Sequence, residues 1–210
     1  MARLIAATVF PPRCILCGFP GASLDLDLCG VCHADLPWAG LSGDASVAFR
    51  YEHPVDELIR RLKYQGVIAH ARALGVLLAE VARERKEALP ALLVPVPLHT
   101  ARWRERGFNQ AAAIARYAGH LLEIPVMRHG VVRVRDTPSQ TALDVNARRR
   151  NVRGAFAVRA GGALDRLCAA GHVAIVDDVI TTGSTVNELR RVLLAAGVRR
   201  VEVWAVARAE

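Results

Sequence analysis

Short apolar runs and longer segments of mixed character alternate along this chain, and their periods predict strands and helices. Residues 92–96, 172–176 and 201–206 are apolar runs of strand length, and residues 47–51 alternate apolar and polar side chains as a half-buried strand does. A weaker strand is expected at 131–134, before a polar, arginine-rich loop. The pattern therefore predicts short strands spread over most of the chain.

Helical segments separate these strands. One helical pattern begins at Pro54, and others are expected at 69–87, 107–122 and 186–196, the last of them ending at Gly197. Strands that alternate with helices favour an α/β fold, with a mostly parallel sheet and right-handed crossovers.

The N-terminal segment differs in composition from the rest of the 210 residues. It is rich in Cys, Gly and Pro and has no sustained apolar period, so its own core would be too small without a metal ion. A break follows near residues 40–44. We therefore expect a small metal-binding module at 1–42 and an α/β domain at 43–210.

Charge and hydropathy limit the classes of partner and location. No stretch approaches the ~20 apolar residues that span a bilayer. The apolar segment 4–10 ends at two prolines without a small-residue cleavage site, which argues against a secretory signal and favours the cytoplasm. The net charge of +8 indicates anionic partners, which include phosphorylated metabolites, nucleic acids and acidic proteins.

Four of the five cysteines lie in the N-terminal segment, as two CxxC pairs: Cys14, Cys17, Cys29 and Cys32. Tandem CxxC pairs without a flanking βαβ pattern favour four thiolates around one structural Zn²⁺ over a redox pair. His33 adjoins Cys32, and a chain neighbour does not easily reach the same metal ion.

The segment VAIVDDVITTGST at 173–185 is the strongest candidate for a ligand site. Ligands of open parallel sheets lie beyond the carboxyl ends of the strands, and here a strand is expected to end where a turn begins, at residue 177. Asp177 and Asp178 supply carboxylates suited to a ribose diol. Hydroxyl and backbone N–H groups suited to a phosphate come from Thr181, Thr182, Gly183, Ser184 and Thr185. The alternative interpretation makes Asp177 a strand-end residue and Ser184 a helix N-cap.

This pattern resembles the signature of type I phosphoribosyltransferases, which bind phosphoribosyl pyrophosphate (PRPP). The resemblance implies a phosphoribosyltransferase-like sheet flanked by helices, with the two acids on the ribose 2- and 3-hydroxyls and the loop on the 5-phosphate. Transfer also requires charge neutralisation at the pyrophosphate, by Mg²⁺ and by basic residues. Arg102, Arg104 and Arg106, expected in a loop that opens a helix, are candidates, and at least one of them is expected to face solvent.

The chain also resembles the ComF family over nearly its whole length. The matching motifs are LIRRLKYQG at 58–66, VPVPLHTARWRERGFNQA at 94–111, the spaced residues Gln140, Leu143, Arg148 and Asn151, and VAIVDDVITTGST at 173–185. The resemblance implies that Lys63 approaches the phosphates, that loop 102–109 serves the pyrophosphate, and that segment 135–151, with Arg148, is a lid.

The ComF resemblance also implies a role in natural competence. The expected ligand is PRPP or a related ribose 5-phosphate, and the expected partners are single-stranded DNA and DNA-processing proteins. Two alternatives stay open: an active Mg²⁺-dependent phosphoribosyltransferase, whose acceptor no motif identifies, and a PRPP-sensing adaptor whose metal module docks a partner protein. We interpret Trp38 and Trp103 as core or interface residues, with stacking on bases as the alternative.

Overall fold

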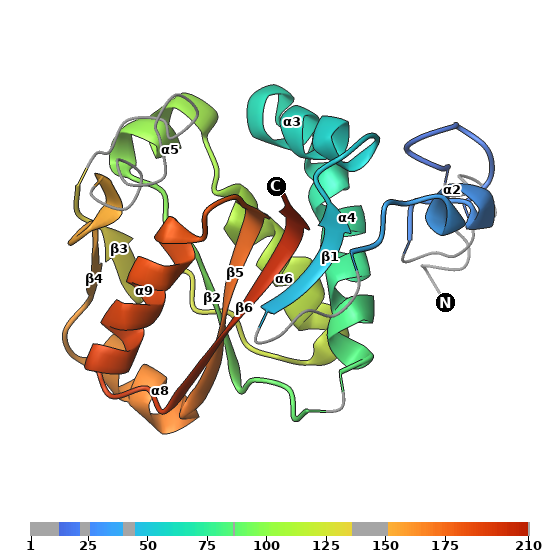
Figure 1. Cartoon of the computed structure of the whole chain (residues 1–210). Helices are drawn as coiled ribbons and strands as arrows, with labels where there is room; N and C mark the ends of the chain where they lie inside the picture. The colour runs from blue at the N-terminus through green and yellow to red at the C-terminus, as the bar shows by residue number, and fades with distance from the viewer. Residues whose placement is uncertain (1–12, 22–25, 40–44, 86, 136–150, 210) are drawn as a thin grey trace, which may run out of the picture.

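The computed structural model describes residues 13–21, 26–39, 45–85, 87–135 and 151–209 (Figure 1). Within them a parallel four-stranded sheet has the order β1-β6-β5-β2. Its strands are β1 (Ala45–Arg50), β2 (Leu92–Pro95), β5 (His172–Ile180) and β6 (Arg200–Arg208). The predicted α/β fold with a parallel sheet flanked by helices is confirmed.

Helices cover both faces of this sheet and stand over its carboxyl edge. Helices α4 (Ile68–Arg83) and α6 (Gln110–Leu122) pack on one face, and α9 (Ser184–Ala195) packs on the other. Two further helices, α3 (Val55–Gln65) and α5 (Thr100–Arg106), lie beyond the carboxyl ends of the strands, at the top of Figure 1. That edge is where ligands of parallel sheets bind.

Alternate residues of each central strand face two separate hydrophobic layers. On β6, Trp204 and Val206 pack with α4 and α6, whereas Val201 and Val203 pack with α9. A parallel sheet that is buried on both faces needs nearly continuous apolar strands. This requirement is why these strands are recognisable in the sequence.

A small antiparallel pair lies beside α9. It consists of β3 (Val131–Arg133), close to the weak strand expected there, and β4 (Phe156–Val158). Helix α8 (Gly162–Ala170) follows β4 at the amino edge of the sheet. Neither β4 nor α8 was expected, because each is short and bounded by glycine and arginine residues that obscure its period.

The strand that carries the acid pair is longer than the sequence predicts. Instead of ending at residue 176, β5 continues to Ile180, because β6 supplies parallel backbone partners as far as Arg208. The expected turn at 177–185 shrinks to residues 181–183, and Asp177 and Asp178 lie inside the strand.

The segment after β2, expected as a loop that opens one helix, contains two helices. Gly107 ends α5 in a left-handed conformation, with φ of 75°, which glycine adopts without strain. Asn109 then caps α6, because its side chain accepts a hydrogen bond from the N–H of Ala112 at 3.1 Å. The arginines of this segment therefore project from a helix.

The described part of the N-terminal segment packs against α4. It includes the short helix α2 (Gly30–Ala34), where His33 Nε2 lies 3.1 Å from Glu80 Oε2. Asp27 forms an ion pair with Arg72, and Leu28 is buried in the same hydrophobic cluster as α4. The division into 1–42 and 43–210 stays a prediction.

Among the helices of the described residues, none combines the length and the apolar character needed to cross a membrane.

Candidate functional site

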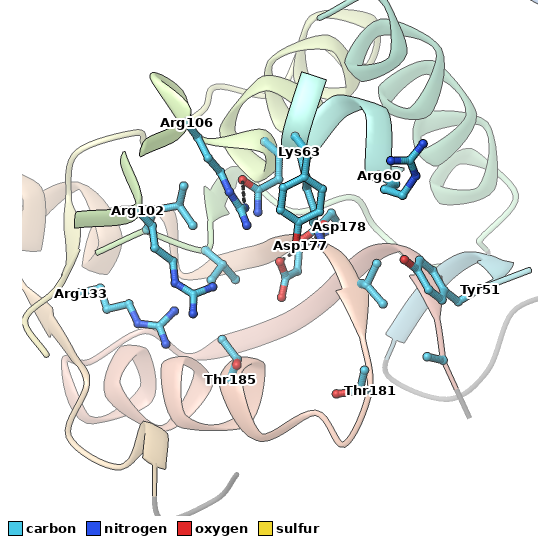
Figure 2. A pocket seen from close by; sticks show the side chains of 16 residues that line it. Tyr51, Arg60, Lys63, Arg102, Arg106, Arg133, Asp177, Asp178, Thr181 and Thr185 are labelled. Carbon is cyan, nitrogen blue, oxygen red and sulfur yellow. Dashed lines mark hydrogen bonds and ion pairs between the residues drawn. The ribbon is translucent and has the colours of Figure 1, made fainter. Parts of the chain in front are cut away.

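A pocket of about 340 Å³ lies at the carboxyl edge of the sheet. Figure 2 shows its walls converging from α3, α5, β3, β5 and the start of α9. Seven predicted site residues line it: Lys63, Arg102, Arg106, Asp177, Asp178, Thr181 and, at the start of α9, Thr185. The structure therefore brings together residues that lie more than 100 positions apart in the sequence.

The acid pair forms the floor of the pocket. Asp178 is buried and forms an ion pair with Lys63 from α3. Asp177 is less buried, and its Oδ1 accepts the backbone N–H of Asp178 at 2.9 Å. Of the two adjacent carboxyl groups, Asp178 is therefore the one whose charge Lys63 balances directly.

The two carboxyl groups differ in acidity. Burial raises the pKa of Asp177 well above its usual value, and the neighbouring Asp178 raises it further. Burial also acts on Asp178, but the ammonium group of Lys63 outweighs it and lowers the pKa of Asp178. A cation bound near Asp177 would favour its ionised form.

The hydroxyl-rich loop follows directly after β5. A small hollow of about 50 Å³ is lined by Asp177 and by Thr181, Gly183, Ser184 and Thr185. The Oγ1 of Thr182 lies 2.8 Å from the Oγ of Ser184, which orders the turn. The backbone N–H groups at the start of α9 and the helix dipole favour an anion here.

Gly183 immediately precedes α9. Its φ of 71° is left-handed, a conformation that disfavours any residue with a Cβ. Ser184 is the first residue of the helix and does not cap it, since no side chain caps α9. The N-cap interpretation of Ser184 is therefore wrong, and the Oγ atom of Ser184 lies against that of Thr182 within the loop.

Helical spacing places two of the three candidate arginines in the pocket and the third outside it. Arg102 and Arg106, four residues apart on α5, line the pocket, and Figure 2 shows both pointing toward Asp177 and Thr185. Arg106 also donates to Gln110 Oε1 at 3.3 Å. Arg104 is exposed and is absent from the lining, as expected for at least one of the three.

Further lining residues escaped the sequence analysis. Arg133 of β3 reaches the pocket, as do Tyr51, Arg60 and Tyr64. Arg60 and Tyr64 recur with Lys63 at helical spacing, so the period of α3 could have revealed them. Tyr51 directly follows β1, at the edge where ligands bind. Arg148 and most of the predicted lid lie outside the described residues.

The four predicted metal ligands come together in the N-terminal segment. The Sγ atoms of Cys14, Cys17, Cys29 and Cys32 all lie within 4.8 Å of one another. Four sulfur atoms at 2.3 Å from a tetrahedral Zn²⁺ lie roughly 3.8 Å apart, so the cluster fits this ion. His33 faces Glu80 instead. The cluster could therefore hold zinc with cysteine ligands alone.

The acidities of the thiols agree with a cation site. Burial disfavours the Cys14 thiolate, but hydrogen bonds from the backbone of Cys17 and Cys29 outweigh it and lower the pKa of Cys14 to about 6. The neighbouring sulfur of Cys17 raises the pKa of Cys32. A bound Zn²⁺ would stabilise all four thiolates at once.

The fold, the pocket and the cysteine cluster define a class: an α/β protein with a polar ligand pocket at the carboxyl edge of a parallel sheet and an attached four-cysteine cluster. No protein-family model matches the chain. Competence protein F of Haemophilus influenzae is 37% identical to it over 201 residues, which cover 92% of this chain and 84% of that protein.

Two further proteins are also similar to this chain. DNA utilization protein YhgH of Escherichia coli is 36% identical over 200 residues, with 93% of this chain and 83% of that protein covered. Competence protein ComFC of Streptococcus pneumoniae is 25% identical over 164 residues, with 76% of this chain and 66% of that protein covered. The chain belongs to the ComF family.

Proposed function

We propose that the protein binds PRPP or a related ribose 5-phosphate in the pocket at the carboxyl edge of the sheet. The observation that carries this proposal is the convergence of one acid pair, one hydroxyl-rich loop and several cationic side chains on the same 340 Å³ space. These groups match the three parts of PRPP: a diol, a 5-phosphate and a pyrophosphate.

Each part of PRPP is assigned to the side chains whose chemistry suits it. Asp177 and Asp178 accept hydrogen bonds from the ribose hydroxyl groups. The loop from Thr181 to Thr185 holds the 5-phosphate at the amino end of α9. Arg102 and Arg106 face the acids from across the pocket and suit the pyrophosphate, because guanidinium groups bind phosphate oxygens in pairs. Mg²⁺ would neutralise part of the pyrophosphate charge, and Asp177 is the carboxyl group of the pocket that would hold it.

The biological role that we propose is DNA utilisation in the cytoplasm, linked to competence. Two relatives support this role by their names, competence protein F and DNA utilization protein YhgH. The cationic surface supplies contacts for single-stranded DNA, and the zinc-binding segment supplies contacts for DNA-processing proteins.

A second candidate, an active Mg²⁺-dependent phosphoribosyltransferase, is favoured by a specific observation. Arg102, Arg106 and Arg133 all reach the pocket, so positive charge surrounds the place where a departing pyrophosphate would develop its negative charge. Release of pyrophosphate from PRPP in the presence of a base, nucleotide or amine would establish this activity. Binding of PRPP without release of pyrophosphate would support the binding function and contradict the transferase.

The test is calorimetry of PRPP, with and without Mg²⁺, on the wild type and on Asp177→Asn. We expect Mg²⁺-dependent binding to the wild type and at least about tenfold weaker binding to the variant, because hydrogen bonds to charged groups contribute about 1.5–3 kcal/mol. Asp165→Asn, an exposed acid of α8 at the other end of the sheet, is the matched control.

A second variant tests the phosphate loop separately. Thr185→Val removes one hydroxyl group at similar volume and should weaken binding of ribose 5-phosphate, which lacks the pyrophosphate. Equal affinity of the wild type and both variants for PRPP would contradict the proposed pocket, as would the absence of binding to the wild type.

A further inference from the structure

A second hollow, of about 700 Å³, adjoins the first one across α5. Thr100 and Trp103 of α5 and Gly107, which ends that helix, line it, whereas Arg102 and Arg106 of the same helix line the first pocket. Because the two sets recur at helical spacing, α5 presents one face to each hollow. We call the second hollow the α5 groove; its other walls come from α6, β3 and the turn before β3.

The α5 groove is strongly cationic. Its lining includes Arg116, Arg128, His129, Arg133 and Arg159. Among its lining residues in the described part of the chain, none is an aspartate or a glutamate. A groove with this charge favours a polyanion, and its volume exceeds that of the neighbouring pocket.

Aromatic side chains lie among these cations. Trp103 is 55% exposed in the groove, and the partly buried Phe108 lies at its floor. The other two tryptophans differ, since Trp204 is fully buried and Trp38 packs between His33 and Phe49. Burial of Trp103 in the core is thus excluded, and the indole is available for contact with a ligand.

We propose that the α5 groove binds single-stranded nucleic acid, with a base stacked on Trp103 and the phosphates near Arg116, Arg128 and Arg159. An exposed indole between arginines provides the two contacts such a strand uses, a stacking surface and a cationic track. A duplex does not fit this role, because its bases are already stacked on each other. The inference rests on the DNA-related function proposed above and assigns it a site separate from the PRPP pocket.

The test is fluorescence anisotropy of a labelled thymidine oligonucleotide of about 16 nucleotides, the upper range of such sites. We expect the wild type to bind and Trp103→Ala to bind about tenfold more weakly, which lies within the range that stacking of a base on one aromatic side chain contributes. Arg128→Ala should lower the slope of log affinity against log salt by about 0.7, the value for one phosphate contact on a single strand.

Two controls match these variants. Phe19→Ala removes an exposed aromatic residue of the cysteine-rich segment, and Arg166→Ala removes an exposed arginine of α8. Both should bind as the wild type does. If the wild type binds DNA but Trp103→Ala is unaffected, or if Phe19→Ala alone abolishes binding, the groove is not the site, although the proposed DNA role survives.

Two further outcomes would overturn the inference. If the wild type does not bind the oligonucleotide, both the proposed groove site and the proposed direct contact with DNA are wrong. That result does not bear on PRPP binding, which the calorimetry tests separately. A polyglutamate peptide that displaces the oligonucleotide as well as an unlabelled thymidine strand of equal charge would show that the groove recognises charge without bases. Quenching of Trp103 fluorescence by the oligonucleotide, but not by the peptide, is the result that supports stacking.

Discussion

At the scale of single residues, the contact between Lys63 and Asp178 links the stability of the protein to its pocket. Asp178 is buried and Lys63 is about one-fifth exposed, so neither charge is well solvated by water. The ion pair raises the pKa of Lys63 against the opposing effect of burial, and it lowers the pKa of Asp178. Both shifts mean that the charged forms are the ones the fold stabilises.

The pH dependence follows from these directions. Since the pKa of Asp178 is lowered by folding, its contribution to stability is present above the unfolded value of about 3.9 and is lost as the pH falls through the folded value. Since the pKa of Lys63 is raised, its contribution is present below about 10.4 and is lost as the pH rises further. The pair therefore stabilises the fold across the neutral range.

Lys63→Met should remove this stabilisation. We expect the free energy of unfolding to fall by about 3 kcal/mol at neutral pH, because the change leaves a buried carboxylate without its cation. Urea unfolding measures the loss. The double variant Lys63→Met with Asp178→Asn should recover part of it, since no uncompensated charge remains. A double variant that is less stable than Lys63→Met alone would contradict the ion-pair account.

At the scale of elements, α5 is the feature that organises the candidate sites. One face of this helix carries Arg102 and Arg106 into the pocket proposed for PRPP, and another carries Trp103 into the α5 groove. Arg133 of β3 lines both hollows. A change in the helix as a whole should therefore affect both ligands, whereas a change in one side chain of α5 should affect one.

Glu105→Pro tests this statement. Glu105 is exposed and lies inside α5, so proline removes a helical hydrogen bond and breaks the helix at a cost of about 3 kcal/mol or more to the helical form. We expect binding of both PRPP and the thymidine oligonucleotide to weaken. Glu105→Ala keeps the helix and should bind both as the wild type does. Loss of one ligand alone in the proline variant would show that α5 does not support both sites.

The same element marks the limit of what the sequence could predict. The parallel sheet, the acid pair and the cysteine cluster were recognisable, because each rests on a local pattern. The end of β5 was not, because it depends on pairing with Arg200–Arg208, which lies later in the chain. Nor was α5, whose seven residues are too few for a hydrophobic period and whose polar character is typical of a loop. Arg133 enters the pocket through tertiary packing alone.

At the scale of the whole molecule, the cysteine cluster and the sheet are connected through a common core. Cys14, Leu28 and Leu36 belong to the same buried cluster as Leu74 and Leu77 of α4. The ion pair of Asp27 with Arg72 and the contact of His33 with Glu80 join the same surfaces. The sequence predicts that residues 1–42 form a separate module. Whether this module unfolds separately from the rest of the chain tests that division.

Removal of zinc should therefore destabilise more than the first 42 residues. We expect a chelator, or the variant Cys29→Ser with Cys32→Ser, to lower the melting temperature of the protein by at least several degrees, since 1 kcal/mol corresponds to about 2–4 °C in a chain of this size. Near-ultraviolet circular dichroism, which reports the buried Trp204 of β6, should follow the same single transition. If loss of zinc instead leaves the Trp204 transition unchanged and adds an earlier one, the module unfolds by itself, and the core that it shares with α4 contributes little to the stability of the sheet.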